Sequence, residues 1–179
     1  MEGIYLGKML TKYIDKKDVS IRVNQLAESI SSKYNIDDEI VVLCIMNGSF
    51  IFCSDLIRKI KQDVVFDSIR LSSYKDKSRG KIEHISDIKE SIEGRHVLIV
   101  EDIVDTGNTI NYLHKYLRKF NPESLRIVSF LFKPKIYKFD IKIDWVGFEI
   151  DDNFVVGYGL DYNARYRDKE SVYKIIDNE

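Results

Sequence analysis

Cysteine and proline are both scarce in this sequence, which has two of each in 179 residues. Cys44 and Cys53 lie in apolar surroundings, at a spacing that suits neither a zinc site nor a disulfide framework, so we expect two reduced thiols in the core. Pro122 and Pro134 mark no linker, and the chain contains no repeat or low-complexity block. We therefore expect residues 1–179 to form a single domain.

Net charge and long apolar runs are lacking as well. The chain has 28 Lys and Arg residues against 29 Asp and Glu residues, and this balance gives no electrostatic reason to expect a nucleic-acid partner. No stretch approaches the run of about 20 apolar residues that spans a membrane. The first ten residues, MEGIYLGKML, lack the basic start, apolar run and cleavage site of a signal peptide. These absences predict a cytoplasmic protein that binds neither membrane nor nucleic acid.

Shorter apolar segments are present, and their patterns alternate along the chain. Near-helical spacing of apolar residues predicts a helix over 19–34, and the unbroken apolar run at 39–46 predicts a strand covered on both faces. Further helices are expected through Leu56 and Ile60 and through Ile110, Leu113 and Leu117, and further strands at 64–71, 96–100, 125–132, 145–150 and 154–161. This alternation predicts an α/β fold with a mainly parallel sheet flanked by helices. The last two strands favour an antiparallel addition, followed by a polar tail.

Residues 72–95 differ in character from the rest, because they are polar, charged and poor in apolar side chains. A long loop of this kind in a compact domain is often a lid over a site. We therefore expect a long mobile loop in this region.

The most informative segment is VLIVEDIVDTGNTI, residues 97–110. A buried strand is predicted to end in two adjacent carboxylates, Glu101 and Asp102. The loop that follows, Asp105-Thr106-Gly107-Asn108-Thr109, opens a helix. Ligands of open α/β sheets bind beyond the carboxyl ends of the strands, and a helix N-terminus offers unpaired N–H groups to an anion. The glycine lets the backbone approach a phosphate closely, and the threonine hydroxyls can donate to its oxygens.

Two carboxylates beside a phosphate would repel it unless the ligand also offers groups that carboxylates bind. A sugar diol donates hydrogen bonds to carboxylates, and Mg²⁺ binds carboxylates and phosphate oxygens together. Phosphoribosyl pyrophosphate (PRPP) has a monophosphate, a diol and a pyrophosphate that chelates Mg²⁺. The alternative is an ordinary strand–turn–helix with a solvated acidic turn. Other nucleotide motifs, G-x-x-x-x-G-K-[ST] and G-x-G-x-x-G, are absent.

The same segment resembles the PRPP-binding motif of the type I phosphoribosyltransferases. From about residue 38 to about residue 168 the chain is similar to the hypoxanthine–guanine phosphoribosyltransferases within that family. The resemblance rests on LCIMNGSFIFCSDL (43–56), IRLSSY (69–74), LFKPK (131–135) and WVGFEIDDNFVVGYGLDYNARYRD (145–168). It implies a small hood region beside the sheet, Mg²⁺ as cofactor, PRPP and a 6-oxopurine base as substrates, and a homodimer or homotetramer.

The resemblance also implies a role for each matching residue. PRPP would be bound by Gly48, Glu101, Asp102, Asp105, Thr106, Gly107, Asn108, Thr109 and Arg167, the purine by Lys133, Phe154 and Val155, and the metal by Asp161, Glu101 and Asp102. Asp105 would also face purine N7 as the general base. Ser73 and Tyr74 would begin the mobile loop. Many relatives have lysine immediately before the glycine at position 48, where this chain has Asn47. In the family, the peptide bond at this step can be cis.

Without the resemblance, each of these residues has an ordinary interpretation. Lys133 would be one of several solvated lysines, Phe154 a core side chain, and Asp161 with Arg167 a surface pair that contributes little. Three other functions also stay open: transfer to another base such as xanthine or a pyrimidine, an RNA-binding regulator on the same fold, and a relative that has lost activity. A regulator would need a basic face.

Overall fold

The larger sheet of the fold has six strands in the order β5-β4-β3-β6-β7-β8. The computed structural model describes residues 3–5, 8–73, 82–85 and 88–176. The strand bounds are β3 Glu39–Met46, β4 Asp63–Ser73, β5 Ile82–Ile85, β6 His96–Val104, β7 Ser124–Phe132 and β8 Trp145–Glu149. All neighbouring pairs are parallel except β4 with β5, so the prediction of a mainly parallel sheet is confirmed.

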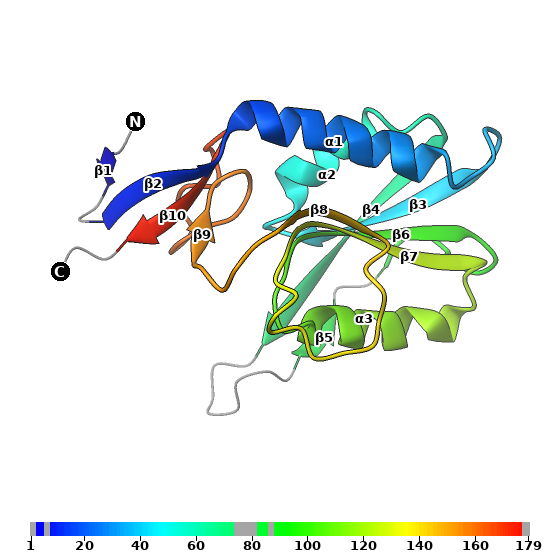
Figure 1. Cartoon of the computed structure of the whole chain (residues 1–179). Helices are drawn as coiled ribbons and strands as arrows, with labels where there is room; N and C mark the ends of the chain where they lie inside the picture. The colour runs from blue at the N-terminus through cyan, green and yellow to red at the C-terminus, as the bar shows by residue number, and fades with distance from the viewer. Residues whose placement is uncertain (1–2, 6–7, 74–81, 86–87, 177–179) are drawn as a thin grey trace.

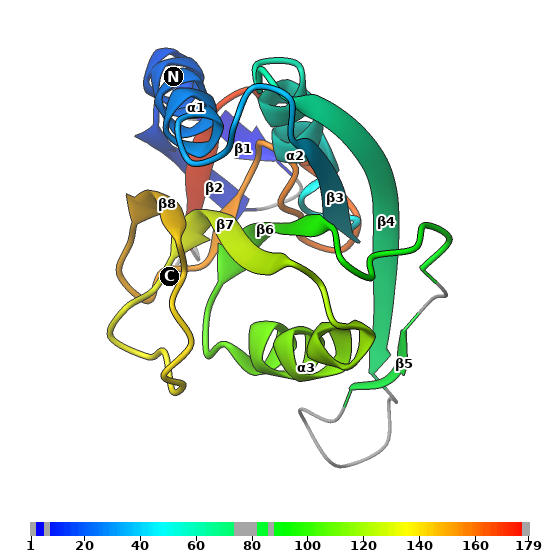
Figure 2. The same ribbon diagram turned by 90° about the vertical axis from the view of Figure 1, so that its right-hand side faces the viewer.

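Helices cover both faces of this sheet, with α1 and α2 on one side and α3 on the other (Figure 2). Their bounds are α1 Lys16–Ser31, α2 Phe50–Ile57 and α3 Asn108–Leu117, which continues into the 3-10 helix η1 Arg118–Phe120. In β3, Val42 and Cys44 pack in the cluster under α1 and α2, whereas Val41 and Leu43 pack in the cluster under α3. Since both faces are buried, this central strand has no polar alternation, as the sequence predicts.

A second, antiparallel sheet has the strand order β1-β2-β10-β9. Its strands are β1 Gly3–Tyr5, β2 Lys8–Ile14, β9 Val155–Val156 and β10 Val172–Ile176. It lies at the end of the molecule toward which the parallel strands β6 and β7 run (Figure 1). This small sheet is the hood that the family resemblance implies. Because β2 pairs with β10, it joins segments near the two ends of the chain.

Three predictions about the last third of the chain are wrong. β8 is parallel to β7 and continues the large sheet, so of the two late strands only β9 belongs to an antiparallel addition. The strand expected at 154–161 ends at Val156, because the next residues, Gly157, Tyr158 and Gly159, all have positive φ angles, of 94°, 48° and 96°. An extended strand requires negative φ. The predicted polar tail contains β10, whose pairing with β2 could not be read from local composition.

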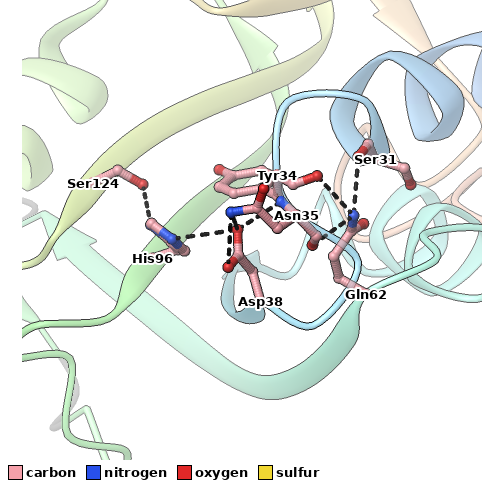
Figure 3. A network of polar contacts seen from close by, with 7 residues as sticks. All are labelled: Ser31, Tyr34, Asn35, Asp38, Gln62, His96 and Ser124. Atoms are coloured by element: carbon pink, nitrogen blue, oxygen red, sulfur yellow. Dashed lines mark hydrogen bonds and ion pairs between the residues drawn. The ribbon is translucent and has the colours of Figure 1, made fainter.

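A polar network lies at the opposite edge of the large sheet, where the parallel strands begin (Figure 3). The buried Gln62 amide donates to the carbonyl oxygens of Ser31 at 2.9 Å and Asn35 at 3.2 Å. Asp38 accepts from the Asn35 N–H at 2.7 Å and lies 3.7 Å from Nε2 of His96. These contacts satisfy carbonyls at and just beyond the last residue of α1. The helix ends at Ser31 and not at residue 34 as predicted.

The remaining outcomes concern α2, the cysteines and membrane crossing. α2 ends at Ile57, so Ile60 lies beyond it, contrary to the prediction. Both cysteines are buried free thiols, as predicted. No helix within the described part of the chain is long and apolar enough to cross a membrane.

Candidate active site

The loops that leave β3, β6, β7 and β8 meet at the carboxyl edge of the large sheet, beside the small sheet (Figure 1). β6 runs on through Glu101 and Asp102 to Val104. The two carboxylates therefore belong to the strand, which runs past the end predicted at residue 100. Parallel pairing of β6 with β7 on one side and β3 on the other fixes their place at this edge.

The Glu101 and Asp102 side chains form a pair of carboxyls held away from water. Glu101 is 7% exposed, and its Oε2 has no hydrogen-bond partner in the described structure. Burial, and next the charge of Asp102, raises the pKa of Glu101 well above its ordinary value. Burial also raises the pKa of Asp102 to about 6, although the Ile103 N–H donates to Asp102 Oδ1 at 2.9 Å and opposes the shift. An unpartnered buried acceptor of this kind suits a donor or cation supplied by a ligand.

Gly48 brings the β3 loop into direct contact with this pair. A Cβ at position 48 would lie 1.6 Å from Oδ2 of Asp102, so any larger residue would displace the carboxylate. Gly159 approaches from the other side, since a Cβ there would lie 2.2 Å from the Gly48 carbonyl oxygen. The Met46–Asn47 peptide bond is cis, and Arg70 donates to the Asn47 side chain at 3.1 Å.

The loop from residue 105 to 109 begins α3 and exposes its N-terminus. Gly107 is the N-cap with a φ of 85°, a conformation that glycine adopts without steric cost. Gly107 makes no side-chain capping bond to the first turn, so the N–H groups of that turn are available to an anion. Asp105 and Asn108 are exposed, and Thr106 and Thr109 are half-buried. The loop therefore has the features of a phosphate site that the sequence predicts.

Lys133 follows β7 and points its ammonium between two carboxylates. Its backbone N–H donates to the Val104 carbonyl at 2.9 Å, which fixes it beside the end of β6. The side chain is only 8% exposed, yet Nζ lies 2.8 Å from Asp152 Oδ1 and 3.8 Å from Asp105 Oδ2. The interpretation of Lys133 as a solvated lysine is therefore wrong.

Phe154 directly precedes β9 of the small sheet, and Val155 is the first residue of that strand. Phe154 is 57% exposed, and its ring stands nearly perpendicular to that of Tyr162, with centroids 5.7 Å apart. The interpretation of Phe154 as a core residue is wrong, and an exposed ring is free to stack on a planar ligand. The Val155 side chain is buried, which leaves its backbone as the part that can contact a ligand.

Asp161 and Arg167 are joined by a tight turn that reverses the chain after β9. The guanidinium NH2 lies 2.7 Å from Asp161 Oδ1, and NH1 donates to the Gly159 carbonyl at 2.6 Å. The Ala164 N–H donates to the other Asp161 oxygen at 2.8 Å. Both side chains are partly buried, so the pair differs from a freely solvated surface ion pair.

The described residues include no group of three or more His, Cys, Asp or Glu side chains gathered to hold a metal ion. Glu101 and Asp102 form one pair, and Asp161 binds Arg167. A cation at this edge would therefore also need oxygen ligands from a bound substrate. Ser73 is the last residue of β4, and Tyr74 lies outside the described residues.

Known proteins identify the family. The profile of the phosphoribosyl transferase domain matches residues 10–163. Hypoxanthine-guanine phosphoribosyltransferase of Aquifex aeolicus is 40% identical over 173 residues, which cover 96% of this chain and 97% of that protein. The chain belongs to the phosphoribosyltransferase family. The Bacillus anthracis hypoxanthine-guanine phosphoribosyltransferase superposes with a TM-score of 0.87 at 36% identity, over 93% of this chain and 96% of that one. Hypoxanthine phosphoribosyltransferase of Trypanosoma cruzi in complex with IMP gives 0.85 at 32% identity, over 96% of each chain.

Two residues that contact the predicted site residues were not identified from the sequence. Asp152 contacts Lys133, and Tyr162 supports Phe154 edge-on. Asp152 follows the carboxyl end of β8, so recognising β8 as a parallel strand of the sheet would have found it. Tyr162 carries no such signal, because the turn that places it depends on positive φ angles at Asn163 and Ala164.

Proposed function

We propose that this protein is a purine salvage enzyme that transfers ribose 5-phosphate from PRPP to N9 of hypoxanthine or guanine. The products are IMP or GMP and pyrophosphate. The observation that carries the proposal is the buried Lys133 ammonium, 3.8 Å from the Asp105 carboxylate at the carboxyl edge of the sheet. A cation can donate to a 6-oxo group, and a carboxylate can accept the proton of N7. The Trypanosoma cruzi relative, which shares the fold and 32% of its residues, binds IMP.

PRPP would lie across the ends of β3 and β6. The free N–H groups at the start of α3, with Thr106, Asn108 and Thr109, suit the 5-phosphate. Glu101 and Asp102 suit the ribose hydroxyls, since the unpartnered Glu101 oxygen needs a donor. The Gly48 backbone and Arg167 suit the pyrophosphate, whose charge a guanidinium binds in bidentate fashion.

We infer that Mg²⁺ is the cofactor, because carboxylate and phosphate oxygens are its preferred ligands. Asp161, Glu101 and Asp102 are the side chains that would hold it. When bound, the ion neutralises the charge that develops on the pyrophosphate leaving group.

The reaction would be a displacement at C1 of the ribose, in which the bond to pyrophosphate breaks and the bond to N9 forms with inversion. Such centres pass through an oxocarbenium-like transition state, so positioning and electrostatics supply most of the acceleration. Asp105 accepts the proton that the base loses, and Phe154 holds the ring plane. Lys133 selects hypoxanthine and guanine over adenine, because an ammonium makes no useful hydrogen bond to a 6-amino group.

We also propose a domain organisation, an assembly state and a location for this protein. We infer that residues 1–179 form one phosphoribosyltransferase domain, which is supported by the pairing of β2 with β10. We also infer a homodimer or homotetramer in the cytoplasm, and sedimentation of the purified protein would test the assembly.

The function is tested by incubating purified protein with PRPP and Mg²⁺ against hypoxanthine, guanine, xanthine, adenine and uracil. We expect nucleotide from hypoxanthine or guanine, and we expect a chelator to abolish it. Product from xanthine or uracil alone would assign a different base to the same scaffold, and no product from any base would reject the proposed activity.

A further inference from the structure

Asp152 is a carboxylate at the site to which neither the sequence motifs nor the proposed reaction gives a role. It lies in the loop after β8 and accepts from Lys133 Nζ at 2.8 Å, a full ångström closer than Asp105 at 3.8 Å. The Lys133 side chain is 8% exposed, whereas that of Asp152 is 66% exposed. A buried ammonium depends on its partners for stability, because water cannot reach it. Asp152 is therefore the nearer of the two carboxylate partners of this ammonium.

We propose that Asp152 is a positioning residue that holds the Lys133 ammonium away from Asp105 and directs it toward the 6-oxo group of the base. The inference rests on the proposed function, since it deepens the role of Lys133 at the same site. Asp152 itself need not touch the purine. It acts through the hydrogen bond that it accepts from the lysine.

The geometry of Lys133 explains why such a residue is needed. An ammonium has three N–H donors, so one bond to Asp152 leaves two for a ligand. Among the described residues, Asp105 is the other carboxylate within ion-pair distance of Nζ. Without Asp152 the ammonium would close on Asp105 and occupy the oxygen that must face N7. Asp152 thus keeps the oxo-binding cation and the proton acceptor apart.

Backbone hydrogen bonds between neighbouring strands hold both sides of the Lys133–Asp152 pair in place. The Lys133 N–H donates to the Val104 carbonyl at 2.9 Å, and the Ile150 N–H donates to the Phe132 carbonyl at 2.8 Å. The first bond fixes the β7 loop to β6, and the second fixes the β8 loop to β7. The two side chains therefore start from fixed positions on neighbouring strands.

A second lysine–aspartate pair links the same two loops and serves as a matched control. Lys135 Nζ lies 2.7 Å from Asp151 Oδ1, but both side chains are largely exposed, at 78% and 66%. Exposed ion pairs of this kind contribute little. Asp151→Asn removes the same charge from the same loop, one residue away, without touching Lys133.

The test compares Asp152→Asn, Asp152→Glu and Asp151→Asn with the wild type. IMP affinity is measured by calorimetry, the affinity for PRPP with Mg²⁺ is measured in the same way, and KM for hypoxanthine is measured by turnover. We expect Asp152→Asn, whose amide oxygen can still accept but carries no charge, to weaken IMP binding and raise KM for hypoxanthine by about tenfold, the scale of the charge's share in such a hydrogen bond. PRPP, which has no base, should bind as before. Asp152→Glu should recover part of the loss, and Asp151→Asn should match the wild type.

Three results would overturn the proposal. Unchanged IMP affinity in Asp152→Asn would remove the residue from the role. An equal loss of IMP and PRPP affinity would show general damage to the site, and an equal loss in Asp151→Asn would show a general effect of loop charge. Thermal unfolding of each variant separates damage to the fold from damage to the site. A wild type that makes no nucleotide from any base would reject the proposed function itself, whatever the variants do.

Discussion

Replacing Gly48 by alanine tests whether the β3 loop and the β6 carboxylates act as one PRPP site. The added Cβ would lie 1.6 Å from Asp102 Oδ2 and 2.4 Å from its Cγ, where ordinary contacts begin at 3.4 Å. The carboxylate would have to retreat by nearly 2 Å on the Oδ2 side. It would then strain the 2.9 Å hydrogen bond that Asp102 accepts from Ile103. Since a misplacement of about 1 Å can cost about a hundredfold in rate, we expect kcat/KM for PRPP to fall by about that factor or more.

The assay is steady-state turnover with PRPP varied at saturating hypoxanthine, together with thermal unfolding. Gly94→Ala is the control, because a Cβ there meets nothing within 4 Å although its φ is 67°. That strain should cost about 1–2 kcal/mol of stability and leave KM for PRPP unchanged. If Gly48→Ala keeps kcat/KM for PRPP within twofold of the wild type, Asp102 has no role in PRPP binding or the loop relaxes without consequence. Either result would refute the reasoning.

Four further predictions follow from particular contacts. Lys133→Ala should reduce the preference for hypoxanthine over adenine, and an unchanged ratio of their kcat/KM values would remove Lys133 from base selection. Asp105→Ala should lower kcat by about 10²–10⁴ with PRPP affinity less affected, and full activity would exclude it as the base. Because burial raises the pKa of Asp102 to about 6, its carboxylate becomes protonated as the pH falls through that value, so KM for PRPP should rise as the pH falls below about 6. Gln62→Leu should lower the free energy of unfolding by about 1–3 kcal/mol in urea, because carbonyls beyond α1 lose their donor in a buried position, and kcat should not change.

The parallel sheet could be predicted from the sequence because its central strands are buried on both faces. The run at 39–46 matches β3 at both ends, and the strand predicted at 125–132 differs from β7 by one residue. The small sheet could not be predicted in this way. β9 has two residues, and β10 pairs with β2, which lies more than 150 residues away in the chain. Local composition carries no signal for a pairing of that range.

In the candidate site, too, some features depend on one continuous segment and others on contacts between segments that are far apart in the sequence. Glu101, Asp102 and the loop from 105 to 109 follow one another in sequence, so their common location could be predicted from one strand–loop–helix unit. The burial of Lys133 could not, because three neighbouring lysines in the segment suggest a solvated face. It depends on the β8 loop, which reaches back across the sheet edge to supply Asp152. The family resemblance implies a role for Lys133, and the tertiary structure shows which contacts hold its side chain.

The charges that should meet the substrates are already paired within the protein. Lys133 is bound by Asp152, and Arg167 by Asp161. The Glu101 and Asp102 carboxyls have raised pKa values, which lowers their charge while no ligand is present. Substrate binding at the proposed site would therefore replace these internal contacts with contacts to the ligand. In the proposed reaction, pyrophosphate would draw Arg167 from Asp161, and a cation bound by Asp161 would make this exchange easier. Binding of PRPP with Mg²⁺ should for this reason be cooperative, since each releases the partner that the other needs.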